Sequence, residues 1–530
     1  MKLVTVHYED DNFGDNLIAV CFEQLLKVAL KNRGLANDSV IKRMTLRELD
    51  SELISNADAV FFAGGGLFGL SYLDFFEPLK KIVKIAELSG VPVVFSSMGI
   101  NNMGASDEND DVLSELLSNQ AIKAVSVREN EKIFMKYLAQ VNDRIKWDIK
   151  TAADPVTWAE AVYHYNNKTY LKQKDESKQV GINVVRGGLF EDNGHHWGLT
   201  NEIEYLSFLR NKLQERGYKT FFYTNGSTLD ENTMRYLGDE KNIPRDEIIS
   251  VDTSRELVEL ISKCDAVAAI RMHSSILSYA FNIPAVNLVW NDKIPCFYEE
   301  TGLPDRTVFM EDEDGIICQP SDAAESAFRK IDELLSKGSE SRKSDYLMTL
   351  YHFLYETIGG LNLDNKPASG ESTSQNAENI NENASDNKKN ADEYKEENVI
   401  ENTEEKAISY NRYEEYKYED IVKELSEIPA TCEINEIVRQ DFSDMKDKLS
   451  RSQNRYLRLF KTERKEVSEL KQVKMEKSSV QKKYESARNE LEKTKSALSV
   501  AEKRLEHIDS ILIFKLYHKI KSLLKKKHKN

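Results

Sequence analysis

With 530 residues, the chain is long enough for two or three domains, and its 89 acidic against 73 basic side chains give a formal net charge of −16. That acidity argues against nucleic acid as a partner, because nucleic-acid binding relies on basic surface. The five cysteines are scattered without a CxxC pair, so the sequence excludes a disulfide framework and favours a reducing compartment.

The N-terminal stretch MKLVTVHYED predicts a strand followed by acids rather than a signal peptide. No apolar run approaches the roughly 18 residues that span a bilayer, so we expect a cytoplasmic protein. Residues 1–357 alternate short apolar runs, such as KLVTVHY, VPVVFSSMGI and QVGINVVR, with helical patterns. This alternation predicts an α/β fold of parallel strands with helices on both faces.

A polar segment, YHYNNKTYLKQKDESKQ, divides this region in two. On both sides of it the triplet Asp-Ala-Val opens an apolar strand, in NADAVFFAGGG and in KCDAVAAIRMHSS. We therefore predict two Rossmann-like domains, 1–160 and 178–357, that face each other across a cleft. One large doubly wound sheet is the alternative.

Two stretches of the first half carry small residues where a strand gives way to the next element. Asn12 and Asp15 in NFGDNL stand at the start of a long helix, where they cap it or contribute to an anion or sugar site. Gly64, Gly65 and Gly66 follow a strand and permit unusual backbone angles and close approach of a ligand. Their spacing matches neither a dinucleotide fingerprint nor a P-loop, so neither NAD nor ATP is implied. Tight packing of strand against helix is the other interpretation of these glycines.

In the second half, Arg271 and His273 interrupt the run CDAVAAIRMHSSILSYAFNIPAVNLV. We expect a buried strand over Asp265–Ile270 and a helix over Ser274–Phe281, with these two side chains at the junction. Such a junction lies at the carboxyl edge of a parallel sheet, where open α/β folds bind ligands. Arginine there recognises phosphate and carboxylate groups by bidentate hydrogen bonds, and histidine exchanges a proton near neutral pH.

Composition changes after Gly359. Residues 361–410 are polar and charged, which predicts a disordered linker, and a tyrosine-rich patch predicts a short helical segment in 413–440. Over 445–512, apolar residues recur at heptad spacing, which predicts a coiled coil and self-association, most simply as a dimer. The tail 511–530 has lysines, no acid and a helical apolar face, which predicts peripheral contact with an anionic membrane. An isolated charged helix and a solvated lysine tail are the alternatives.

Taken in order, several stretches resemble the polysaccharide pyruvyl transferase family: NFGDNL, DAVFFAGGG, VVFSSMGI, VSVREN, AADPV, IRMHSSILSYAFNIPAV and WNDK. The resemblance covers roughly residues 1–310 and leaves the coiled-coil region outside it. It implies a fold similar to the two-domain GT-B glycosyltransferases. It also implies transfer of an enolpyruvyl unit from phosphoenolpyruvate to a sugar. The product would be a pyruvate ketal on a surface polysaccharide or its precursor, with release of phosphate.

By that resemblance, Arg271 and His273 bind and activate phosphoenolpyruvate, and Lys293 matches a lysine of the family. A second arginine is needed if the phosphate and the carboxylate are held separately. Arg186, after GINVV, is the first candidate and Arg128, in VSVREN, is the second. The expected partners are phosphoenolpyruvate and a glycan or lipid-linked sugar acceptor, with no cofactor.

Other functions remain compatible with these residues. A GT-B-like glycosyltransferase that uses a sugar nucleotide would have the same fold. The chain would instead be a non-catalytic scaffold if its coiled coil recruited partners and its α/β domains were inert. His195 and His196 lack a third ligand at metal spacing, so no metal site is predicted. Whether His273 acts as acid, base or electrostatic clamp stays open.

Overall fold

The computed structural model describes most of the first 361 residues and one helix beyond them. The described ranges are 1–9, 11–35, 39–69, 73–101, 115–129, 149–164, 177–311, 316–337, 344–361 and 416–427, with isolated positions elsewhere. The chain forms two compact units, Met1–Lys446 and Asp447–Asn530. Apart from Leu361 and a few isolated positions, the predicted linker 361–410, coiled coil 445–512 and tail 511–530 lie outside the described residues.

The first sheet occupies the N-terminal part of the chain. Its strands are β1 (Lys2–His7), β2 (Val40–Thr45), β3 (Ala59–Phe62), β4 (Gly65–Gly69), β5 (Val93–Asn101), β6 (Ile122–Val127) and β7 (Ile149–Thr151). Their order is β2-β1-β3-β5-β6-β7, with β4 beside β5, and all neighbouring strands are parallel. The central strands are almost wholly buried, as expected where helices cover both faces of a parallel sheet.

A second, separate parallel sheet follows. It contains β8 (Gln179–Asn183), β9 (Lys219–Tyr223), β10 (Ile248–Ile249), β11 (Ala266–Ala269), β12 (Ala285–Val289) and β13 (Thr307–Phe309). The order is β10-β9-β8-β11-β12-β13, again with parallel neighbours. The predicted α/β fold with parallel sheets is confirmed, and the alternative of a single large sheet is wrong.

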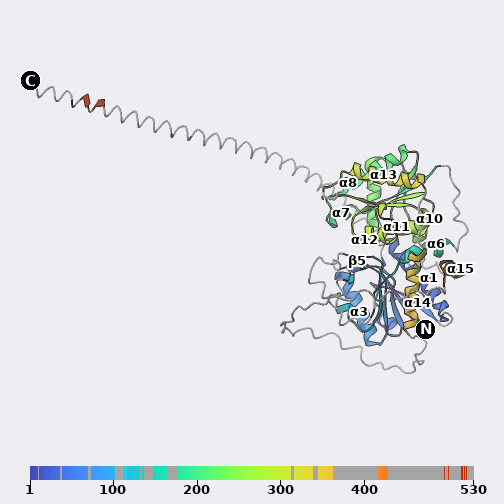
Figure 1. The fold of residues 1–530 in the computed structure, drawn as a ribbon. Helices are drawn as coiled ribbons and strands as arrows, with labels where there is room; N and C mark the ends of the chain where they lie inside the picture. The colour runs from blue at the N-terminus through green and yellow to red at the C-terminus, as the bar shows by residue number, and fades with distance from the viewer. Residues whose placement is uncertain are drawn as a thin grey trace, which may run out of the picture. The chain divides into compact units, whose positions relative to one another are not determined.

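Helices connect and cover these strands (Figure 1). The α-helices are α1 (Phe13–Asn32), α2 (Ser51–Ser55), α3 (Leu73–Leu88), α6 (Ala159–His164), α7 (Leu189–Asp192), α8 (Leu199–Glu215), α9 (Thr228–Lys241), α10 (Ser254–Ser262), α11 (Met272–Ala280), α12 (Lys293–Glu300), α13 (Pro320–Lys337), α14 (Ser344–Gly360) and α15 (Tyr418–Glu427). Short 3-10 turns are η3 (Pro155–Trp158), η5 (Arg245–Glu247) and η6 (Pro304–Arg306). The helix α15 lies within the predicted helical segment 413–440.

Helix α14 follows the second sheet in the chain but packs against α1, β5 and β7 of the first half (Figure 1). Two hydrogen bonds fix it there: the Trp158 indole nitrogen donates to the Leu347 carbonyl at 3.1 Å, and the Ala153 amide donates to the Thr349 hydroxyl at 2.9 Å. The last helix after the second sheet therefore belongs, by its contacts, with the first sheet. The domain boundaries at 160 and 357 stay predictions.

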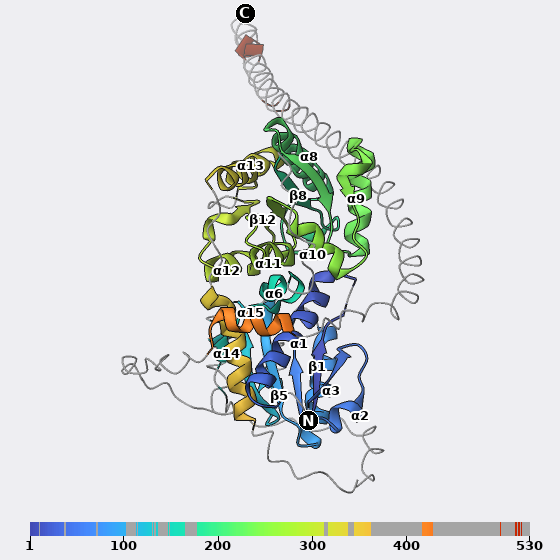
Figure 2. The same cartoon turned by 90° about the vertical axis from the view of Figure 1, so that its right-hand side faces the viewer.

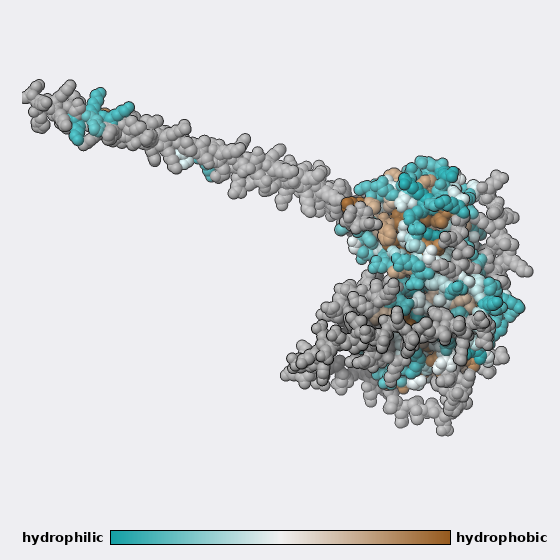
Figure 3. Space-filling view, in the orientation of Figure 1, coloured by the Kyte–Doolittle hydropathy of each residue, from teal (hydrophilic) through white to brown (hydrophobic). Residues whose placement is uncertain are grey.

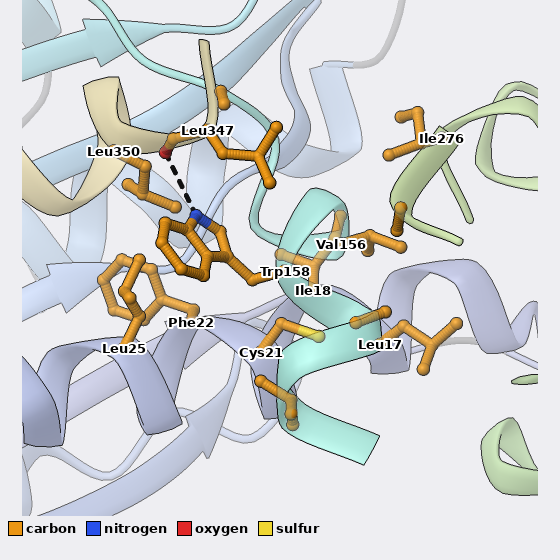
Figure 4. Packing of buried hydrophobic residues seen from close by; sticks show 14 of the residues in the cluster. Leu17, Ile18, Cys21, Phe22, Leu25, Val156, Trp158, Ile276, Leu347 and Leu350 are labelled. Atoms are coloured by element: carbon orange, nitrogen blue, oxygen red, sulfur yellow. Dashed lines mark hydrogen bonds between the residues drawn. The ribbon is translucent and has the colours of Figure 1, made fainter. Parts of the chain in front are cut away.

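One apolar cluster joins the two halves. In Figure 4, Trp158 and Val156 of η3 lie among side chains from three other helices. These are Leu17, Ile18, Cys21, Phe22 and Leu25 of α1, Ile276 of α11, and Leu347 and Leu350 of α14. Each buried large apolar side chain stabilises the fold by about 1.5–3 kcal/mol. This cluster holds the second sheet's helix α11 against the first half.

Among the residues drawn in colour in Figure 3, hydrophilic ones predominate, with apolar ones between them. Within the described ranges, no helix is long and apolar enough to cross a membrane.

Candidate functional site

Each sheet has a point where the strand order reverses, between β1 and β3 in the first and between β8 and β11 in the second. Open α/β folds bind ligands at such points. The stretch NFGDNL follows β1, Gly64 follows β3, Arg186 follows β8 and Arg271 follows β11. The residues predicted from sequence are thus divided between the two switch points.

Arg271 is the N-cap of α11 and is held by groups of its own half. Its amide donates to Asn183 Oδ1 at 2.8 Å, while Nε and Nη2 donate to the two oxygens of Asp230 at 3.0 and 2.6 Å. Burial alone would lower the pKa of Arg271, but the fully buried Asp230 carboxylate outweighs burial and raises it. The guanidinium is therefore a permanent cation whose Nη1 makes no hydrogen bond to any described residue.

His273, two residues later, lies against the first half of the chain. A Cβ at Gly14 would be 2.4 Å from His273 Nδ1 and 2.6 Å from its Cβ, so only glycine fits at position 14. Gly14 is the glycine of NFGDNL, whose helix α1 begins where Asn12 Oδ1 accepts a hydrogen bond from the Gly14 amide at 3.1 Å. Two motifs that are far apart in the sequence therefore meet at one contact.

A buried carboxylate lies on the other side of His273. Asp154, from AADPV, has its Oδ2 atom 3.8 Å from His273 Nε2 and pairs through the same oxygen with Arg128. Its Oδ1 accepts from the Val156 amide at 2.8 Å and so caps η3. Burial would raise the pKa of Asp154, but Arg128, His273 and the Val156 amide lower it to about 2. His273 therefore faces a carboxylate that stays ionised at neutral pH.

Arg128 is buried next to Asp154 and is not open to solvent. It is 4% exposed and donates from Nε to Glu129 Oε2 at 2.8 Å as well as pairing with Asp154. Glu129 also accepts from the Ile100 amide at 3.1 Å. The arginine proposed from sequence as a second ligand for substrate is thus already shared by two buried carboxylates.

Lys293 and Asp15 approach the same region from opposite halves. Asp15, in the first turn of α1, lies within electrostatic range of Arg128, Arg271 and Lys293. Burial, reinforced by Arg128, lowers the pKa of Lys293 to about 8 against the opposing effect of Glu129 and Asp15. Among the residues the structure describes, the half-buried Lys293 ammonium has no hydrogen bond or ion pair. It is a cation that an anionic ligand would satisfy.

The first glycine of the run, Gly64, is packed tightly against the protein itself. Gly64 and Gly65 have φ of +106° and +93°, so the predicted unusual backbone angles are present, while Gly66 lies in β4. A Cβ at Gly64 would be 3.2 Å from the Ser97 carbonyl and 3.3 Å from Ile18 of α1. At Gly64 the chain itself therefore makes a close approach, and ligand binding at the three glycines stays a prediction.

Ser97 connects this packing to the site. It is a buried residue with φ of +49°, and its hydroxyl donates to the Ala153 carbonyl at 2.8 Å, next to Asp154. Left-handed angles at non-glycine residues persist only where the surroundings hold them. The VVFSSMGI stretch thus supports the turn that presents Asp154.

Arg186 is placed differently from the other predicted residues. Its Nη2 pairs with Asp192 at 2.5 Å, and the structure gives it no contact with His273. Arg186 and Arg271 both lie within electrostatic range of Glu202, a fully buried residue of α8. Burial and the nearby Asp230 raise the pKa of Glu202 well above its ordinary value, which favours its neutral form. Glu202 therefore lies within electrostatic range of both members of the Arg271–Asp230 pair.

Sequence reasoning placed Gly14 at the entry to a helix but missed four other residues of this arrangement: Glu129, Asp154, Glu202 and Asp230. Asp154 stood within the quoted AADPV stretch, so its place in a motif was a usable signal. No local pattern marks Asp230 or Glu202, because each is one of several acids on a helix and is selected only by the fold.

Several solved structures have a distant likeness to the chain. Heptosyltransferase II of E. coli is 13% identical, with 64% of this chain and 99% of that chain covered and a TM-score of 0.35. The UDP-GlcNAc 2-epimerase of Methanocaldococcus jannaschii is 10% identical, with 68% and 100% covered and a TM-score of 0.43. The corresponding epimerase of Neisseria meningitidis is 12% identical, with 68% and 100% covered and a TM-score of 0.40. Likenesses this distant carry no functional argument.

No curated protein matches the chain in sequence. In contrast, residues 12–292 match the family model of the polysaccharide pyruvyl transferases, and this range is more than half of the 530 residues. It contains Gly14, Arg128, Asp154, Arg271 and His273. The chain belongs to the polysaccharide pyruvyl transferase family.

Proposed function

We propose that the protein transfers a pyruvyl group from phosphoenolpyruvate to a sugar of a surface polysaccharide or its precursor, forming a ketal and releasing phosphate. The observation that carries the proposal is the position of His273, which lies against Gly14 and 3.8 Å from Asp154. Family membership supplies the class of reaction, and the cations at this place suit a donor with two anionic groups.

The donor would be held by two cations of the second half. Arg271 is held in place by Asp230 and leaves Nη1 for a phosphate or carboxylate oxygen. Lys293 supplies a second positive charge for the other anionic group. Arg128 is better placed to position Asp154 than to bind the donor, because it already pairs with two carboxylates. Arg186 remains an outer candidate, engaged by Asp192.

The chemistry requires two proton movements. As a sugar hydroxyl attacks the central carbon of the donor, His273 takes the hydroxyl proton, and the methylene carbon gains a proton from Lys293 to become a methyl group. Asp154 stabilises the positive charge that His273 acquires. A second hydroxyl then attacks the same carbon, and the bond from that carbon to the phosphate oxygen breaks. The two hydroxyl protons account for the methyl proton and for the proton that leaves with phosphate.

His273 is 8% exposed in this structure, so contact with substrate needs a small rotation of its ring or a small shift of α1. Catalytic hydrogen bonds often tighten only when substrate is bound. Asp15 acts electrostatically on Arg271 and Lys293, and in this mechanism it would orient the acceptor hydroxyls.

The direct test incubates the full chain with phosphoenolpyruvate and a panel of glycosides that carry neighbouring hydroxyls. We expect phosphate release that depends on the glycoside, together with a ketal detectable by mass spectrometry and NMR. Phosphoenolpyruvate should also raise the thermal unfolding midpoint more than UDP-sugars do. Transfer of a sugar from a nucleotide donor, with no reaction of phosphoenolpyruvate, would instead establish a glycosyltransferase.

We also propose that the region 445–512 joins two copies of the chain and that the tail 511–530 contacts an anionic membrane. Their support is the heptad pattern and the lysine-rich sequence. Each lysine near such a surface contributes on the order of 1 kcal/mol. Removing 511–530 should therefore abolish salt-sensitive binding to anionic vesicles and leave turnover intact. A full chain that ignores these vesicles at low salt would make the tail a solvated end.

A further inference from the structure

The helix α15 (Tyr418–Glu427) lies beyond the residues that match the family, 12–292, yet it packs on the first half of the molecule. It contacts α1, α6 and α14 and lies across them in Figure 2. A segment so far from this surface in the chain must be held there by contacts of its own. Those contacts identify a surface for which the family match gives no role.

The apolar side of α15 is fully inserted. Ile421 and Leu425 are 0% and 2% exposed, at the four-residue spacing that places both side chains on one face of a helix. Ahead of them, the Tyr418 ring lies 5.2 Å from the Trp158 ring, measured between centroids. The Tyr416 ring packs edge-on against Tyr351 and Tyr355 at 5.9 and 5.5 Å. These contacts are those of an amphipathic helix seated in an apolar surface.

Charged and polar groups fix the direction of the helix. The end of α1 is basic and the end of α15 is acidic: Lys31 Nζ lies 3.6 Å from Glu424 and 3.2 Å from Glu427. The amide of Asn32, assigned so that both ends are satisfied, donates to Glu424 at 2.8 Å and accepts from the Tyr351 hydroxyl at 2.9 Å. The surface therefore fits an acidic amphipathic helix in one orientation.

This surface reaches the candidate site through Trp158. Trp158 ends η3, the turn that Asp154 caps, and its indole nitrogen donates to the Leu347 carbonyl of α14 at 3.1 Å. Tyr418 of α15 covers the same indole ring. Since Asp154 faces His273 at 3.8 Å, whatever loosens Trp158 loosens the carboxylate behind the histidine.

We propose that Lys31, Asn32, Trp158, Tyr351 and Tyr355 form a docking site for an acidic amphipathic helix, that the chain's own α15 occupies it, and that occupation positions Asp154 opposite His273. The docking is independent of the reaction, whereas the positioning rests on the proposed function. The occupant we assign is the helix of the same chain, and a second copy is an alternative that the experiment separates.

The binding test uses the full chain and a fluorescent peptide of residues 416–427. Ile421→Asp with Leu425→Asp places carboxylates in the apolar seat and should unseat α15, whereas Lys423→Asp adds a carboxylate on the exposed side and serves as the matched control. The peptide should bind the double variant in a saturable way. Wild type and control should bind it at least about tenfold more weakly, because their own helix occupies the site.

Equal binding to all three proteins would overturn the proposal, because α15 would not occupy the surface in solution. Absence of binding to the double variant would overturn it as well, provided its unfolding midpoint shows that the variant is folded. Replacing residues 416–427 with a glycine–serine segment gives a second empty site that carries no buried charge. Energy transfer between differently labelled chains would show that α15 docks on a second copy instead, if the transfer is lost in the double variant, because association through 445–512 is the same in both proteins.

The activity test separates positioning from mere stability. The double variant should lose turnover about five- to tenfold and keep its KM for phosphoenolpyruvate, since Arg271 is untouched, and the added peptide should restore turnover. If the peptide binds but turnover is unchanged, docking stands and positioning is wrong. If wild type itself does not react with phosphoenolpyruvate, the proposed function fails and the binding result still decides the docking.

Discussion

Arg271 and His273 stand two positions apart in one strand-to-helix junction, yet their partners come from different halves of the chain. Arg271 pairs with Asp230 of α9, which belongs to the second half as Arg271 does. His273 lies against Gly14 of α1 and opposite Asp154, both from the first half. The arginine is therefore held by its own half, whereas the environment of the histidine depends on how the two halves pack.

This difference predicts two kinds of variant. Changes around Arg271 should alter donor binding with little effect on the chemical step, because its cation stays within one half. Changes around His273 should reduce turnover with little effect on donor binding, because they disturb a contact made only when the halves are packed together. The separation of KM from kcat is the measurement that tests the comparison.

The largest effect is expected from His273→Ala. Turnover should fall by roughly two to four orders of magnitude, the usual range for a general acid–base group, while the KM for phosphoenolpyruvate changes little. Asp154→Asn should cause a smaller loss, since the histidine remains but its carboxylate is gone. Phosphate release with a saturating glycoside measures both. Near-normal turnover of His273→Ala would remove His273 from the mechanism.

Gly14→Ala tests the same contact from the other side. The new methyl group would lie 2.4 Å from His273 Nδ1 and 2.6 Å from its Cβ, so the ring or α1 must move. We expect turnover to fall by between about ten- and a hundredfold, with a destabilisation of about 1–3 kcal/mol. Gly360→Ala, where a Cβ meets nothing within 4 Å, is the matched control and should retain activity.

Part of the site around Arg271 and His273 could be predicted from the sequence. The junction itself was predictable, because an apolar strand and an apolar helix flank two cationic residues. The strand observed is Ala266–Ala269 and the helix begins at Met272, two residues earlier than expected, since Arg271 is the N-cap. Local pattern suffices for such elements because burial and helix capping are properties of neighbouring residues.

The partners were not predictable in the same way. Nothing in NFGDNL indicates that its glycine touches His273, and Asp230 is one of several acids in α9. Tight packing was one interpretation of Gly64, but no local pattern identifies Ser97 and Ile18 as its neighbours. Contacts between residues far apart in sequence follow from how the sheets and helices pack, and they leave no periodic signal.

Arg271→Lys is expected to have an intermediate effect, confined to the donor. A lysine keeps the charge but cannot pair with Asp230 through two nitrogens and still offer a third to the donor. Loss of one charge-assisted hydrogen bond should raise the KM for phosphoenolpyruvate about tenfold, with a smaller change in kcat. A loss confined to kcat would mean that Arg271 acts in the chemical step. The proposed division, with donor binding at Arg271 and chemistry at His273, would then be wrong.

Lys293 shares features with both Arg271 and His273, so it also tests the comparison between them. It begins α12 in the second half, but the charged groups that act on it, Glu129, Arg128 and Asp15, belong to the first half. Burial, with help from Arg128, lowers its pKa to about 8, so the cation is lost as the pH rises through that value. If the ammonium holds a donor anion, the KM for phosphoenolpyruvate should rise a few-fold above about pH 8.

Two substitutions separate this effect from other titrations. Lys293→Arg keeps a cation throughout and should remove the rise in KM, whereas Lys293→Met should raise KM at every pH. Both should lower kcat, because neither side chain can donate the methyl proton. The pH dependence of thermal stability tests independently whether Lys293 is desolvated. The unfolded chain holds this proton up to about 10.5, whereas the folded chain releases it at about 8, so the fold disfavours the charged form at neutral pH. Lys293→Met should therefore raise Tm at pH 7, and the gain should shrink between pH 8 and 10.5. A Tm gain that does not change with pH would mean that the lysine is not desolvated, and its assignment as a donor ligand would lose its physical basis.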